Sequence, residues 1–148
     1  MTTHTIQLHR VLTAPAERVY RAFLDPHALC KWLPPHGFTA HMLAQDARQG
    51  GSYRMAFTHF ATGHSHTFGG QYLELVPHQR LRYTAQFDDP ALPGTMQTTV
   101  HLRPLPCGVD VHITQEGIPE AIPPENCTLG WQQSLALLGQ LVEGGEGA

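Results

Sequence analysis

The sequence is poor in charged residues and contains no basic run. Only 14% of its 148 residues are Asp, Glu, Lys or Arg, against roughly 25% in an average globular protein. The formal net charge is −3, and no cluster of Lys or Arg provides the surface that a phosphate backbone or an anionic membrane would need. We therefore expect neither nucleic acid nor membrane as a partner.

Cysteine is scarce as well, and long apolar stretches are missing. Cys30, Cys107 and Cys127 are far apart and form no Cys-x-x-Cys pair, so neither a disulfide framework nor a zinc ribbon is indicated. No window approaches the roughly 20 apolar residues of a membrane span, and the amino terminus lacks the basic start and apolar stretch of a signal peptide. These absences predict a cytoplasmic protein with reduced cysteines.

The motifs of common catalytic sites are also missing. No serine lies in a Gly-x-Ser-x-Gly context. Gly50-Gly51 lacks the following helix and lysine of a phosphate-binding loop. The residues thus identify no reaction, and we expect no cofactor and no bound metal.

What the sequence does contain is helical patterns at its two ends and strand patterns between them. Its length predicts a single domain over residues 1–143, followed by a disordered, glycine-rich tail over residues 144–148. Ala14-Pro15 and Asp25-Pro26 each predict the start of a short helix, because proline fits the first helical turn. Pro34-Pro35 ends the second of these helices.

The middle of the chain predicts an antiparallel sheet. Alternating residues around 6–10 indicate an opening strand. Six later segments also have strand patterns, at about residues 38–45, 52–59, 65–76, 80–88, 95–104 and 108–116. The connections between them are of hairpin length, which favours a meander. Gly69-Gly70 lies inside a strand pattern, where glycine marks a bulge or a close approach of another element, and a bulge would curve the sheet.

A long helix is predicted from Glu125 to Val142. Large apolar residues recur along it at intervals of four, three and four, namely Trp131, Leu135, Leu138 and Val142. A helix with such an apolar stripe must pack against the sheet. The predicted fold class is therefore α+β, with a curved antiparallel sheet wrapped around the last helix and a hollow beneath that helix.

Eight short motifs occur in the order that is seen in one known family. They are Ala14-Pro15, Asp25-Pro26, Trp32, Gly37-Phe38, Asp46-x-Arg48-x-Gly50-Gly51, Gly70-x-Tyr72-x-Glu74, Pro77-x-x-Arg80-Leu81-x-Tyr83-Thr84 and Gly130-Trp131-x-x-Ser134-Leu135. The chain resembles the heat shock protein 90 ATPase activator homologue-like domains. These belong to the START-related SRPBCC superfamily, which includes the birch pollen allergen and the polyketide cyclases. The resemblance covers nearly the whole chain and implies the helix-grip fold, a ligand cavity and often a homodimer, but no motif carries over chaperone binding.

Strand parity predicts which side chains line the cavity, because alternate residues of a strand share a face. The candidates are ten strand residues and two tryptophans from the predicted helices, namely Trp32, Tyr53, Met55, Phe57, His66, Phe68, Tyr72, Tyr83, Phe87, Met96, Thr98 and Trp131. An ordinary core position is the alternative for each of them. Buried tyrosine hydroxyls need a partner, so Tyr53, Tyr72 and Tyr83 are the best candidates for a polar contact with a ligand.

Histidine is abundant, with 11 residues, and three of them lie close together in the sequence. His64 and His66, two apart on a strand, would share a face and could bind zinc together with His59. No carboxylate or cysteine is nearby to complete such a site, and the hairpin tip Thr62-Gly63 favours exposure to solvent. We therefore expect these histidines to be surface residues without a metal.

The sequence as a whole predicts a protein whose cavity binds a small apolar or aromatic molecule. A cyclase- or hydrolase-like enzyme in the same cavity is one alternative, with His66, Tyr72 and Arg82 as the available acids and bases. However, Arg82 has the parity of the outer face. The other alternative is an interaction protein, including a co-chaperone, that works through the exterior of the sheet. An apolar stripe on that exterior would favour it.

Overall fold

The computed structural model describes residues 3–143, so the predicted tail at 144–148 lies outside the described residues. Along the chain the elements are β1 (Thr3–Leu12), α1 (Ala16–Leu24), α2 (Pro26–Trp32), β2 (Phe38–Gln45), β3 (Ser52–His59), β4 (Ser65–Val76), β5 (Arg80–Phe87), β6 (Met96–Leu105), β7 (Gly108–Pro119) and α3 (Pro124–Glu143). The predicted α+β class, with two short helices after the first strand and a long helix at the end, is confirmed.

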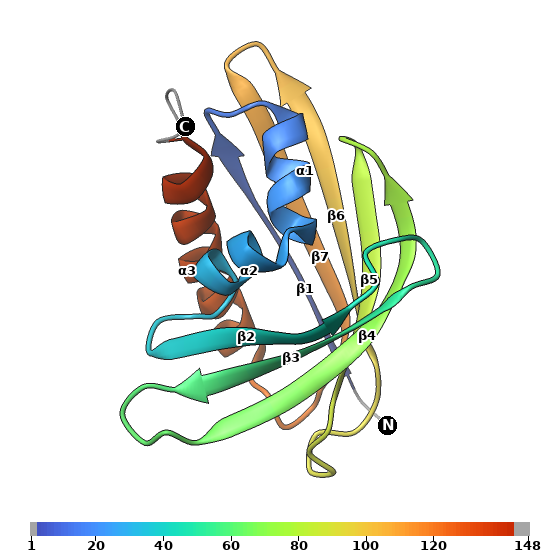
Figure 1. Cartoon of the computed structure of the whole chain (residues 1–148), viewed down its shortest axis with the longest axis vertical. Coiled ribbons are helices and arrows are strands. Elements are labelled where there is room, and N and C mark those ends of the chain that lie inside the picture. The colour runs from blue at the N-terminus through green and yellow to red at the C-terminus, as the bar shows by residue number, and fades with distance from the viewer. Residues whose placement is uncertain (1–2, 144–148) are drawn as a thin grey trace.

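The seven strands form one antiparallel sheet in the order β1-β7-β6-β5-β4-β3-β2. The predicted meander runs unbroken from β2 to β7, and β1 adds to its far edge. Figure 1 shows that β2, β3 and β4 cross the molecule at a large angle to β1, β6 and β7. The sheet is therefore strongly bent, and α1 and α2 connect its two edge strands.

Glycine allows the close approach of strands at this bend. A Cβ atom on Gly70 would lie 1.8 Å from the carbonyl oxygen of Thr84, so a larger residue would push β4 away from β5. The close approach predicted for this glycine pair is thus present. The register shift between β4 and β5 lies further along the strand, between Tyr72 and Glu74, and not at the glycines.

The two short helices begin close to where the sequence places them. In α2, the Asp25 side chain accepts a hydrogen bond from the His27 amide at 2.9 Å, and Pro26 occupies the first turn, as predicted. In α1, Pro15 has an extended backbone and caps the helix, which starts only at Ala16. Pro15 therefore precedes the helix that it was predicted to start.

The long helix α3 lies against β1, α1 and α2 on the concave side of the sheet (Figure 1). The predicted apolar stripe is buried, with exposures of 9% for Trp131 and 0% for Leu138. The Ser134 hydroxyl donates to the Leu33 carbonyl oxygen at 2.6 Å, which ties α3 to the end of α2. Within residues 3–143, no helix combines the length and apolar character needed to cross a membrane.

Candidate functional site

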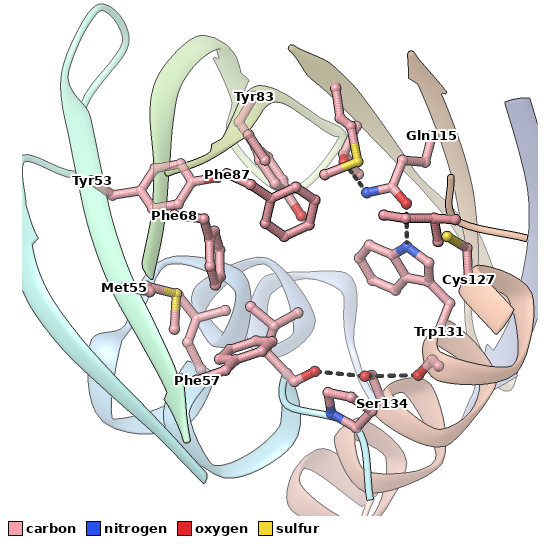
Figure 2. A pocket seen from close by; sticks show the side chains of 18 of the residues that line it. Tyr53, Met55, Phe57, Phe68, Tyr83, Phe87, Gln115, Cys127, Trp131 and Ser134 are labelled. Carbon is pink, nitrogen blue, oxygen red and sulfur yellow. Dashed lines mark hydrogen bonds between the residues drawn. The ribbon is translucent and has the colours of Figure 1, made fainter. Parts of the chain in front are cut away.

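A cavity of about 280 Å³ lies between α3 and the bent part of the sheet. In Figure 2, Tyr53, Met55, Phe57 and Phe68 face the open space from β3 and β4, and Trp131 faces it from α3. An apolar cavity of roughly 150 Å³ is enough to bind benzene. The larger volume here therefore has room for a molecule of about two rings.

Eleven of the twelve predicted cavity residues line this cavity. They are Tyr53, Met55, Phe57, His66, Phe68, Tyr72, Tyr83, Phe87, Met96, Thr98 and Trp131. Ten of these lie on strands β3 to β6, where alternation directs them to the concave face. Their position in the wall is thus observed, while contact with a ligand stays a prediction.

Trp32 is the exception, because it is a core residue and not part of the cavity wall. Its side chain is fully buried, and its indole N–H donates to the carbonyl oxygen of Ala22 at 2.9 Å. The ring packs edge-on against Phe23, with centroids 4.7 Å apart. Trp32 therefore joins α2 to α1, and Phe23 takes a place in the wall instead.

The remainder of the wall comes mainly from helices and connections, where strand parity makes no prediction. These residues are Phe23, Leu29, Leu33, Pro35, Ala85, Gln115, Ile122, Asn126, Cys127, Gly130 and Ser134. Gln115 could have been recognised from the sequence. It has the same parity in β7 as Val109, Val111 and Ile113, and a polar residue at an inward position of an apolar strand indicates a special role.

Three side chains of the wall, from β6, β7 and α3, form a chain of hydrogen bonds at one end of the cavity (Figure 2). The Trp131 indole N–H donates to Gln115 Oε1 at 3.2 Å, and Gln115 Nε2 donates to the Thr98 hydroxyl at 3.1 Å. The Thr98 side chain opposes the rise in the pKa of the Tyr83 hydroxyl, which places Tyr83 beside this group. This polar end can orient a ligand that carries a single polar group on an apolar body.

Two of the three tyrosines already have protein partners for their hydroxyls. Tyr53 donates to the carbonyl oxygen of Thr84 at 2.7 Å, and the Tyr72 hydroxyl accepts from Gln45 Nε2 at 3.0 Å. Burial raises the pKa of Tyr53, Tyr72 and Tyr83 above its usual value, so all three hydroxyls stay neutral. Tyr83 is the tyrosine that belongs to the polar end.

His66 is the side chain in the aromatic part of the wall whose ordinary pKa lies near neutral pH. Its ring lies 5.9 Å from that of Phe57 and 6.2 Å from that of Phe87, measured between centroids. Burial lowers the pKa of His66, the charge of His64 lowers it further, and Asp89 acts in the opposite direction. The imidazole is therefore neutral at pH 7, and the cavity wall carries no charge at this point.

The three histidines that are close in the sequence form no group of metal ligands among the described residues, although the His59 amide donates to the His64 carbonyl oxygen at 2.8 Å. His64 precedes β4 and is exposed, as predicted, whereas His66 faces the cavity. The Nδ1 atom of His59 lies 3.2 Å from the Thr62 hydroxyl at the hairpin tip. In the described part of the chain, the potential metal ligands that do come together are on β1 and β7.

Comparison with known proteins agrees with this architecture. A model of the family described as Activator of Hsp90 ATPase homolog 1-like protein matches residues 13–143. A crystal structure from Chromobacterium violaceum is 67% identical, with a TM-score of 0.93 and coverage of 94% of this chain and 96% of that chain. A Nitrosomonas europaea structure is 23% identical, with a TM-score of 0.81 and 96% coverage of both chains, and shares the fold. No curated protein matches the chain.

Proposed function

The chain belongs to the Activator of Hsp90 ATPase homolog 1-like family, and we propose that its role is to bind a small apolar or aromatic molecule in the cavity beneath α3. One observation carries this proposal. The cavity of about 280 Å³ has a largely apolar wall rich in aromatic rings, and Trp131, Gln115 and Thr98 form a hydrogen-bonded group on one side of it. Sites for small organic ligands combine an apolar wall with a few placed polar groups in this way.

The positions and hydrogen-bond partners of the candidate acids and bases support binding without catalysis. Arg82 belongs to the outer face, where its guanidinium lies 3.9 Å from the carboxylate of Glu74. The Tyr72 hydroxyl is held by Gln45. Of the three groups considered for a cyclase-like reaction, His66 alone keeps an unengaged position in the wall, and general acid–base catalysis ordinarily uses a second placed group.

The exterior of the sheet at β1, β7, β6 and β5 does not favour the co-chaperone alternative. Outward positions across β1, β7, β6 and β5 are mostly polar, and include Gln7, His9, Asp110, His112, Thr114, Gln97, Thr99, His101, Arg103, Arg80 and Arg82. An interaction surface of ordinary type has an apolar centre. This face offers no continuous apolar stripe among the residues described on these four strands.

Binding of an environment-sensitive apolar dye tests the proposal directly. Thr98→Phe places a ring at the polar end of the cavity, and we expect it to weaken dye binding at least about tenfold, or roughly 1.4 kcal/mol. Gln86→Phe is the matched control, because it adds the same ring at an exposed outward position on β5. Its dye affinity should equal that of the unmodified protein.

Native mass spectrometry of the purified chain provides the second measurement. We expect a retained mass consistent with a small organic molecule, and we expect the Thr98→Phe protein to lack it. Equal dye affinity in Thr98→Phe and Gln86→Phe would place the dye outside the cavity. Absence of dye binding would contradict the proposed binding site. The alternative of an interaction protein would then be the better explanation.

A further inference from the structure

We propose that His9, Asp110 and His112 form a binding site for one divalent transition-metal ion on the outer face of the sheet. Strand pairing creates this group. His9 on β1 stands opposite His112 on β7, and Asp110 lies two residues before His112, so all three project from the same face. This site is separate from the cavity, which lies on the concave side of the sheet.

The Asp110 carboxylate already orients both imidazoles. Its Oδ1 atom lies 3.0 Å from His9 Nδ1, and its Oδ2 atom lies 3.0 Å from His112 Nε2. The two rings are stacked, with centroids 5.0 Å apart and an angle of 11° between their planes. One potential ligand atom from each residue is thereby brought together with the others, and these three atoms lie within 4.8 Å of one another.

This spacing is close to what a bound ion requires. Zinc bonds of roughly 2.1 Å in a tetrahedral arrangement separate the ligand atoms by about 3.4 Å. The two contacts of 3.0 Å would have to open slightly to admit the ion. Small side-chain rotations can supply that movement, because the His9 and His112 side chains are 59% and 44% exposed.

The donor set also indicates which ions would bind. Two imidazoles and one carboxylate suit Zn²⁺, Ni²⁺ and Cu²⁺, and three protein ligands leave coordination positions open for water or another molecule. The Asp110 side chain is only 13% exposed, which holds the carboxylate in place between the two rings. Arg103 stands opposite Asp110 on β6, yet both carboxylate oxygens face the histidines.

Isothermal titration with Zn²⁺ tests the site in the full, tag-free chain after treatment with a chelator. The protein should carry Cys107→Ser and His4→Ala, because the exposed thiol and the histidine near the amino terminus are other ligands for metal. We expect one Zn²⁺ per chain. Asp110→Asn and His9→Asn should each weaken binding at least about tenfold, since each removes one of three ligands.

His64→Ala is the matched control, because it removes an exposed histidine that lies outside the group. Its Zn²⁺ affinity should not change. If Asp110→Asn lowers the stability of the fold, the exposed His9→Asn change decides the question. Binding that survives both His9→Asn and Asp110→Asn, or no binding at all, would reduce these residues to a hydrogen-bonded surface triad and overturn the proposal.

Discussion

The two halves of the sheet face the helices in different ways. On β6 and β7 the inward side chains are mostly aliphatic and almost completely buried, as in Val100, Val111 and Ile113. On β3, β4 and β5 they are largely aromatic, and Phe57 and Phe87 are only partly buried at the cavity. Both halves have the same alternation of inward and outward residues. Parity therefore predicts which side chains face inward, but not whether the space in front of them is filled.

The position of α3 explains the difference. The helix packs against β1, at the straight edge of the sheet, while the bent half curves across to β2 and α2. Aromatic rings of the bent half contact one another edge to face, as Phe57 and Phe68 do at 4.9 Å. Rings that pack together along the sheet leave space between themselves and α3. The hollow half and the filled half are thus products of one curved sheet and one straight helix.

Truncation of a large side chain should separate the two halves most strongly. Leu138 is 0% exposed in the filled half, and Met55 is 1% exposed but borders the cavity. Leu138→Ala should cost about 3–5 kcal/mol of unfolding free energy, and Met55→Ala about 2 kcal/mol, since a side chain beside a void has fewer partners to lose. Urea denaturation curves measure both values.

Leu129→Ala is the control for these truncations, because Leu129 lies on α3 and is 56% exposed. Its effect should stay within about 0.5 kcal/mol. Equal losses for Leu138→Ala and Met55→Ala would mean that the cavity side of Met55 is as closely packed as the core, and would break the comparison.

Enlargement of a side chain should give the next largest difference. Thr98 and Val100 are inward neighbours on β6, but Thr98 lines the cavity and Val100 lies in the filled half. Val100→Phe should overpack the core and cost about 1–3 kcal/mol. Thr98→Phe has space for its ring and loses the hydrogen bond from Gln115, so its cost should be about 1 kcal/mol or less.

Thermal and urea unfolding of the two variants measure this difference, and the m-values should be equal if both remain two-state. A larger loss for Thr98→Phe than for Val100→Phe would contradict an open cavity at Thr98. It would also remove the explanation offered for any effect of Thr98→Phe on dye binding.

Much of the fold could be predicted because local patterns and the global structure agree. The four spaced residues of α3, from Trp131 to Val142, face the interior as their periodicity predicts. Asp25 caps α2 through its own side chain. These features depend on neighbours within a few residues, and such short-range chemistry can be read directly from a sequence.

The site was harder to predict where it depends on contacts between distant segments. Trp32 is predicted in the cavity wall but lies in the core against α1. No pattern in a short helix says whether such a ring turns toward a sheet or toward another helix. Asn126 and Cys127 enter the wall only because of where α3 begins relative to the sheet. The His9 and His112 pair depends on a strand register that joins residues about 100 positions apart.

The smallest expected effect concerns pH and the cavity half alone. Burial, followed by the charge of His64, lowers the pKa of His66 below its ordinary value, and Asp89 only partly opposes this. The unfolded chain, with a histidine pKa near about 6.5, therefore binds the proton more readily than the folded chain. The stabilising contribution of neutral His66 is present above about pH 6.5 and is lost as pH falls through the folded pKa.

NMR titration of the His66 imidazole measures this directly, and its midpoint should lie below about 6.5. Dye affinity should fall as the pH passes below that midpoint, because a protonated imidazole in an apolar wall opposes occupation by an apolar molecule. His66→Phe should flatten the pH dependence of dye binding, whereas His64→Ala should keep it and move its midpoint to higher pH, because the charge of His64 lowers the pKa of His66. A midpoint above about 6.5, or an unchanged pH dependence in His66→Phe, would show that His66 is hydrated and lies outside the binding wall. In that case the hollow half of the sheet would have to bind its ligand deeper, between Tyr83 and Trp131.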